Sequence, residues 1–480
     1  MISIAILSLL LSSIYIFSQN ITLIFFINIS VLFLLSIFDE RKFIITYIGY
    51  LFTYKFLIPY NSIDAILELL PIFLNFLLII PMLIKYSQVK IYRYGFIIKL
   101  FFPLLAIVCS MLLSFFVNQS NVFELVRWNI WVLNIVPLLF YVYYSRINHI
   151  ILMNDIKNLL IILFLIQVPI VSMQFGDTFL NYSSNPDTFS GTLGPGGTSF
   201  LSFFCSMLFY FMAYDSLVKK NFLKILLLIP IILLLTFISD IVFTIVVCIL
   251  FPVIILLFRK FFNINFSKRF IRNSLLISVV VLVLFSGKRI KSIYDLVDSQ
   301  ESVFNSNRLN VQELVYYSSM ITTNEDGLKF GRSLGLLYSF NSIVESNFTN
   351  QIFGYGPGST RSEKSVVQNT GPPKIRPVPH TNFFGIDRII LEFGFLGLFL
   401  FIYLFFVIGK FTLGFNSDKN LEKTYFLILF VYFIYGAVYD GGWFFNPLKN
   451  GIFWIITGLV FSYLDQKHYE KNYLYSSKRN

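Results

Sequence analysis

Residues suited to phosphate chemistry and proton transfer follow one another in the last third of the sequence. They are Arg332, Gly354, Gly356, Gly358, His380, Asn382, Arg388 and Glu392. Arginine binds a phosphate through two parallel hydrogen bonds, and a neutral imidazole accepts a proton near neutral pH. Glycines in a turn can present backbone N–H groups to a phosphate. The set suits a reaction in which a base activates a nucleophile while cations stabilise a phosphate.

Each of these residues also has a purely structural interpretation. A Gly-x-Gly-x-Gly sequence is often only a tight turn, and His380 could simply pack its segment against a helix bundle. Arg388 and Glu392 are four residues apart, so on a helix they share one face. There they form an ion pair, or Arg388 faces an anionic lipid headgroup. The residue types leave these alternatives open.

Membrane-spanning helices are the elements that must position these residues. Hydrophobic residues make up 56% of the 480 residues and charged residues only 13%, whereas soluble domains carry roughly 25% charged residues. A soluble fold of this length has no interior large enough for so many apolar side chains. The apolar run at residues 2–17 has no basic segment before it and no clear cleavage site, so we expect a retained span and not a signal peptide.

Apolar runs long enough to cross a bilayer recur along the chain. A crossing takes about 20 apolar residues, and we expect about fourteen spans on this criterion. They are predicted near 2–17, 21–38, 43–58, 65–84, 96–117, 128–144, 159–175, 201–214, 222–239, 241–258, 274–286, 389–409, 424–440 and 451–464. The predicted fold class is therefore an all-α polytopic membrane protein.

The distribution of Lys and Arg predicts how these spans are oriented. The net charge of +12 comes from basic residues that gather in alternate segments between spans, as expected for cytoplasmic segments. Basic residues in the short outer loops and outer span ends are only Lys55, Arg127, Arg388 and Lys449. Both termini are then cytoplasmic. The charge needs no nucleic-acid partner to explain it.

This topology divides the chain into four parts. Residues 1–286 form a bundle of about eleven spans with an outer loop at 176–200, and residues 287–380 form a large, partly helical outer loop. Residues 381–464 supply three further spans, and 465–480 a cytoplasmic tail. The outer loops contain no Asp-x-Asp sequence and no His/Cys cluster, so we expect no metal and no cofactor.

The order of these features resembles the O-antigen polymerase and O-antigen ligase superfamily of bacterial membrane glycosyltransferases. The resemblance rests on four sequences, which cover residues 330–400 closely. They are Arg332, Gly354-Tyr-Gly356-Pro-Gly358, His380-Thr-Asn382 and Glu392-Phe-Gly394-Phe-Leu-Gly397. A Ser-Gly-Thr turn at Ser190-Gly191-Thr192 is similar to an earlier family motif. The arginine that often precedes this turn is absent, since Thr188 and Phe189 stand there. The helix after Arg332 lacks the usual Trp, and its longer spacing to Gly354 makes Arg308 a rival for the loop arginine.

The resemblance implies a lipid-linked substrate on the outer leaflet of the bacterial cytoplasmic membrane. The donor would be an undecaprenyl-pyrophosphate-linked glycan, with membrane lipids around it and a chain-length regulator and a flippase as further partners. His380 would be the base, and Arg332 or Arg308, with Arg388, would bind the pyrophosphate. The other implied substrate-binding residues are Gly354, Gly356, Gly358, Asn382, Glu392, Gly191 and Thr192.

Several functions remain compatible with the sequence. A polymerase joins lipid-linked repeat units, whereas a ligase performs the same chemistry with a lipid A core sugar as acceptor. A polysaccharide transporter or flippase would be expected to show internal repeats or charges buried within spans. A scaffold without catalysis would not need His380, Arg332 and the glycine turn together. We expect the polymerase.

Overall fold

The part of the protein that the structure describes is built almost entirely from helices. Apart from short interruptions, the computed structural model describes residues 21–53, 65–86, 95–180, 198–218, 268–280, 321–330, 339–359, 385–413 and 447–477, with scattered residues between 228 and 250 and residue 432. These residues fall into two compact units, each assembled from three separate stretches of chain. Within the described ranges, three helices are long and apolar enough to cross a membrane. They are Lys99–Asn118, Ile151–Gln174 and Gly385–Lys410.

The first unit comprises residues 1–70, 146–308 and 418–432. Its long helices are α2 (Ile21–Phe38), α3 (Glu40–Thr53), α9 (His149–Leu180) and α10 (Thr198–Val218). α3 packs against α2 and α9, and α10 packs against α9. The ring of Phe204 on α10 lies 4.5 Å from that of Phe52 and 6.1 Å from that of Phe164, measured between ring centroids. These aromatic contacts join α3, α9 and α10 in one core.

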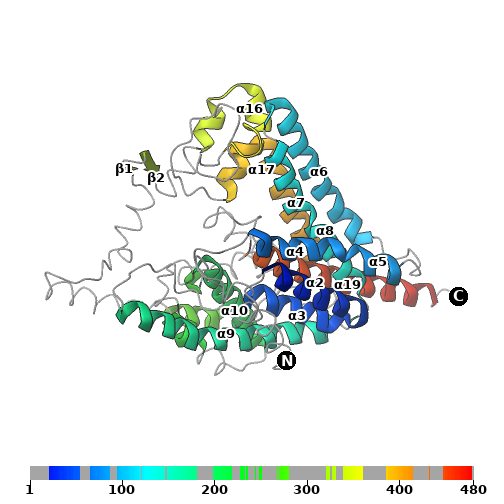
Figure 1. The fold of residues 1–480 in the computed structure, drawn as a ribbon. Helices are drawn as coiled ribbons and strands as arrows, with labels where there is room; N and C mark the ends of the chain where they lie inside the picture. The colour runs from blue at the N-terminus through cyan, green and yellow to red at the C-terminus, as the bar shows by residue number, and fades with distance from the viewer. Residues whose placement is uncertain are drawn as a thin grey trace. The chain divides into compact units, whose positions relative to one another are not determined.

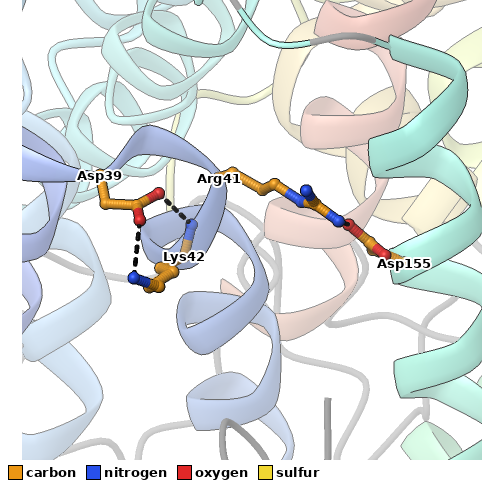
Figure 2. Close-up of polar contacts among 4 residues, drawn as sticks. All are labelled: Asp39, Arg41, Lys42 and Asp155. Carbon is orange, nitrogen blue, oxygen red and sulfur yellow. Dashed lines mark hydrogen bonds and ion pairs between the residues drawn. The ribbon is translucent and has the colours of Figure 1, made fainter.

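Charged contacts fix the start of α3 (Figure 2). Asp39 precedes the helix, and its carboxylate accepts hydrogen bonds from the backbone N–H of Lys42 (3.0 Å) and from its ammonium group (3.0 Å). Burial raises the pKa of the Asp39 carboxyl, but the bonds from Lys42 outweigh it and lower the net pKa below its usual value. Asp39 therefore caps the helix as a charged group. Arg41 forms an ion pair with Asp155 near the start of α9.

The second unit comprises residues 71–145, 309–417 and 433–480. Its helices are most of α4 (Ala65–Leu77), α5 (Ile79–Tyr86), α6 (Gly95–Asn118), α7 (Val122–Leu133), α8 (Ile135–Tyr144), α16 (Phe348–Phe353), α17 (Gly385–Leu413) and α19 (Pro447–Ser477). The strands β1 (Ile321–Asn324) and β2 (Gly327–Phe330) form an antiparallel pair in which Ile321 faces Phe330. The long loop, predicted to be partly helical, thus also contains a β-hairpin.

α6 packs along α17, and α8 packs along α19. Gly458 of α19 lies so close to α8 that a Cβ there would be 3.0 Å from the carbonyl oxygen of Leu139. The Tyr143 hydroxyl donates to the Asp465 carboxylate over 2.6 Å, in a buried position. The end of α8 is thereby held against the middle of α19.

Two predicted spans are interrupted. The predicted span 65–84 is divided into α4 and α5 at Leu78, and the predicted span 128–144 begins earlier and is divided into α7 and α8 at Asn134. In both cases a proline stands four residues after the last residue of the first helix, where its ring opposes the preceding carbonyl. Asn75 and Asn134 are hydrogen bonded to each other near these breaks (2.9 Å).

Other boundaries agree more closely or extend further than predicted. The span 21–38 is confirmed as helix α2, and 96–117 corresponds to α6. Residues 176–180 and 198–200, predicted to belong to an outer loop, are helical, because α9 continues to Leu180 and α10 begins at Thr198. The tail predicted at 465–480 is helical to Ser477, as a continuation of α19. Backbone hydrogen bonds let a helix continue beyond its apolar stretch.

Candidate functional site

The glycine loop, defined as residues 354–359, follows the short helix α16. Asn347 caps α16, its side chain accepting the N–H of Asn350 over 2.8 Å. The helix ends at Gly354, where φ is 71° and ψ is −163°. Gly356 and Gly358 also have positive φ, at 97° and 81°. Residues with a Cβ rarely adopt these backbone conformations, so the path of the loop depends on glycine.

The glycine loop lies against a break in α17. Helical geometry is interrupted at Gly394, with φ 65° and ψ −163°. A Cβ added at Gly354 would lie 2.5 Å from backbone atoms of Glu392 and Phe393, and one added at Gly394 would lie 2.4 Å from the carbonyl oxygen of Ile352. The two backbones therefore approach each other through paired glycines.

Hydrogen bonds join the loop to the residues just before the break. The N–H of Tyr355 donates to the carbonyl of Leu391 (2.7 Å), and the N–H of Gly356 donates to the carbonyl of Glu392 (3.2 Å). The Glu392 side chain is 2% exposed and accepts the N–H of Gly358 over 3.0 Å. The loop thus supplies donors to carbonyls near the end of a helical segment, groups that otherwise lack partners.

α6 completes the arrangement from a third part of the chain. The Asn118 amide donates to the carbonyls of Gly354 (3.0 Å) and Ser114 (2.9 Å). The Ser114 hydroxyl donates to the carbonyl of Glu392 over 2.8 Å. Residues 114–120, 354–359 and 391–394 therefore form one polar unit, which we call the glycine-loop cluster.

Apolar contacts support the cluster on one side. Ile343, which precedes α16, packs in a buried group with Ile390 and Leu391 of α17. The Tyr355 hydroxyl donates to the carbonyl of Ser342 over 2.8 Å. The spacing of Leu336, Phe340, Ile343 and Val344 would place them on one face of a helix. Of the three that the structure describes, only Ile343 is buried, while Phe340 and Val344 are about half exposed.

The structure brings together four of the predicted site residues. Gly354, Gly356, Gly358 and Glu392 belong to the glycine-loop cluster. Arg388 lies one helical turn before Glu392 on α17 and is partly exposed. The remaining predicted site residues lie outside the described residues. They are Arg308, Arg332, His380, Asn382, Gly191 and Thr192.

The structure shows a packing role for the glycines, and their predicted contact with substrate stays a prediction. Every backbone N–H from residue 354 to 359 donates within the protein, with Pro357 carrying none; the acceptors are the carbonyls of Asn350, Leu391, Glu392 and Gly356 and the Glu392 carboxylate. These amides are not presented to a phosphate in this structure. The glycines instead allow close packing of two backbones. The Glu392 carboxylate, predicted to bind substrate, accepts a bond from the loop.

Sequence reasoning overlooked the contribution of α6. Ser110, Ser114 and Asn118 recur at intervals of four in the apolar part of the helix after Lys99, and all three are buried. Such spacing places polar groups on one helix face, and buried polar side chains within a span form hydrogen bonds to neighbouring segments. This pattern was visible in the sequence. Asp387, in the first turn of α17, is also fully buried.

No protein-family model matches the chain, and no curated protein matches it. In the part of the chain that the structure describes, no group of three or more His, Cys, Asp or Glu residues is arranged to hold a metal ion. The geometry of the glycine-loop cluster and the order of the sequence motifs are therefore the basis for assigning a function.

Proposed function

We propose that the protein polymerises undecaprenyl-pyrophosphate-linked oligosaccharide repeat units into O-antigen or a related surface polysaccharide. The reaction would take place at the outer leaflet of the bacterial cytoplasmic membrane. The observation that carries the proposal is the glycine-loop cluster. The family resemblance rests partly on the sequences Gly354–Gly358 and Glu392–Gly397. These two sequences pack against each other, although Gly358 and Glu392 are 34 positions apart in the chain.

The position of the cluster supports an active site at one end of two candidate spans. α6 ends at the cluster, and α17 meets the cluster close to its start. The positive-inside rule independently assigns the end of α6 and the start of α17 to the outer side. A lipid-linked donor has its reactive carbon just outside the headgroups, so a site at the outer ends of spans suits it.

Two contacts join segments that the same topology assigns to the cytoplasm. Arg41 and Asp155 belong to segments that the distribution of basic residues assigns to the cytoplasm, and they form an ion pair. Tyr143 and Asp465 lie at span ends assigned to the cytoplasm, and they share a hydrogen bond. Neither pair joins segments that the topology places on opposite faces. Fourteen spans with both termini cytoplasmic is therefore the arrangement that we propose.

The proposed reaction is the transfer of one glycan to another. A hydroxyl of the acceptor sugar attacks the anomeric carbon of the donor, forming a new C–O bond as the bond from that carbon to the pyrophosphate oxygen breaks. The hydroxyl proton passes to His380, and undecaprenyl pyrophosphate leaves with the bonding electrons. Pyrophosphate leaves readily once its charge is stabilised, so arginines serve better than a protonating acid.

We expect that Arg388→Lys, together with Lys at position 332 or 308, lowers polymer formation and does not preserve full activity. A lysine keeps the charge but loses the planar fork that binds phosphate through two hydrogen bonds. The measurement is the distribution of glycan chain lengths from purified lipid-linked repeat units. An unchanged distribution with Lys at all three positions would remove the phosphate role, and Arg361 and Arg376 would be tested next.

We expect residues 287–380 to be exposed on the outer side of the membrane. A cysteine at Ser302 or Ser365 should react with an impermeant maleimide added to cells whose outer membrane has been opened and whose cytoplasmic membrane is intact. A cysteine replacing Lys419, which is assigned to a cytoplasmic segment, serves as the matched control and should react only after permeabilisation. Labelling of Ser302→Cys solely from the cytoplasmic side would overturn the topology.

Deletion of the gene tests the proposed function directly. Loss of a polymerase leaves lipopolysaccharide with the core and one repeat unit. Loss of a ligase instead leaves bare core, while polymer accumulates on the carrier lipid. Surface polysaccharide that is unchanged in the deletion strain would contradict both activities.

A further inference from the structure

Two polar side chains of α6 each hold a different backbone segment of the glycine-loop cluster. Asn118 donates to Gly354 in the loop, and Ser114 donates to Glu392 before the α17 break. Asn118 is 5% exposed and Ser114 is fully buried. A buried amide or hydroxyl is costly without hydrogen-bond partners. These bonds therefore favour one relative placement of the loop and the helix.

The bond from Ser114 also bears on the first turns of α17. Glu392 lies one turn after Arg388, the arginine proposed to bind the pyrophosphate, and both precede the break at Gly394. His380 stands five residues before Gly385, where α17 begins, a length that spans at most about 18 Å when fully extended. The start of α17 therefore limits how far the proposed base can lie from the arginine.

We propose that Asn118 and Ser114 are positioning residues for the transferase reaction, holding the glycine loop and the start of α17 so that His380 and Arg388 act on one substrate. The inference rests on the proposed function. It adds to that function a contribution from α6, a helix more than 200 residues earlier in the chain. Neither residue contacts the substrate in this scheme.

A role limited to stability makes different predictions from a positioning role. A stabilising contact, once lost, reduces the amount of folded protein while each folded molecule retains its turnover. Loss of a positioning contact lowers kcat per folded molecule, while the KM for the donor changes little. Misplacement of reacting groups by about 1 Å costs up to about 100-fold in rate.

Asn118→Asp is the principal test, because it preserves shape but replaces the N–H donors with an oxygen that faces two carbonyls. We expect kcat for polymer formation to fall roughly 10- to 100-fold, with the KM for lipid-linked repeat units within about twofold. Asn129→Asp is the matched control. It removes a similar amide bond to a carbonyl four residues earlier on α7 (2.8 Å), and it should change kcat by less than about twofold.

Ser114 provides a second and milder pair of variants. Ser114→Ala removes the hydroxyl that donates to Glu392, whereas Ser114→Thr retains it. We expect Ser114→Ala to lower kcat and Ser114→Thr to restore most of it. This pair keeps the inference testable if Asn118→Asp fails to fold.

Hydrogen exchange of residues 354–359 supplies a readout besides activity. The loop amides are hydrogen bonded in the cluster, so their exchange should be slow in the wild type and faster in Asn118→Asp and Ser114→Ala. Faster exchange together with lower kcat supports the inference. Faster exchange with unchanged kcat overturns it while the proposed function stands. A wild type that makes no polymer from lipid-linked repeat units overturns the proposed function, and the positioning role with it.

Discussion

Replacing Gly354 with alanine is expected to undo the glycine-loop cluster. The residue has φ 71° and ψ −163°, a combination found essentially only in glycine. The new Cβ would lie 2.5 Å from backbone atoms of Glu392 and Phe393, which cannot move aside as a side chain does. Strain and overpacking together should cost about 3 kcal/mol or more at this contact. We expect polymer formation per folded molecule to fall at least about 100-fold.

Gly356→Ala provides a comparison in which the obstacle is a side chain. A Cβ at Gly356 would lie 1.8 Å from the Ser120 hydroxyl oxygen, so Ser120→Ala should restore part of the lost activity. No such removal of a side chain can relieve Gly354→Ala, since its neighbours are backbone atoms. Thermal unfolding in detergent and polymer yield measure both variants. Wild-type stability and activity in Gly354→Ala would contradict the close approach described above.

His380→Ala is expected to leave folding and membrane insertion intact and to lower the rate roughly 10²–10⁴-fold, the usual contribution of a general base. The reason is the position of His380, a few residues before α17 begins at Gly385 and at the predicted outer surface. Polymer formation per folded protein, from purified lipid-linked repeat units, is the measurement. Because His149 begins α9 on the predicted cytoplasmic side, His149→Ala serves as the matched control and should have little effect.

The competing view holds that His380 only packs its segment against the bundle. It predicts lower protein levels and an activity loss in proportion to them. Near-normal specific activity in His380→Ala would remove the base from the mechanism. The reaction would then depend on electrostatic stabilisation of the leaving pyrophosphate by arginines.

Hydropathy predicted the existence of helices better than their interruptions. The run 21–38 is a single helix, α2, as expected, because its length and composition suffice to define it. The break at Gly394 could not be predicted in this way, since an average over some 20 residues is insensitive to one position. Its cause lies elsewhere in the chain, in the backbone of residues 352–354 that packs against it.

Prolines explain some interruptions but do not predict them alone. Pro81 and Pro137 follow the breaks at Leu78 and Asn134, whereas Pro103 and Pro169 lie inside uninterrupted helices. The two interruptions differ from Pro103 and Pro169 in that a hydrogen bond between Asn75 and Asn134 lies near both breaks. This bond depends on tertiary packing. For the site, the order of motifs predicted that the glycine loop and Glu392 belong together. It did not predict that Glu392 would bond to that loop.

The hydrogen bond from Asn118 to Gly354 has a consequence for the order of synthesis. Its two residues are 236 positions apart, and a ribosome adds about 5–20 residues per second. The end of α6 is therefore made roughly 10–50 seconds before its partner exists. During that time the Asn118 amide can use the Ser114 carbonyl of its own helix, to which it also donates. A nascent chain that stops before residue 354 carries α6 with its later acceptors missing, so the cluster can be completed only after residue 394 has been made.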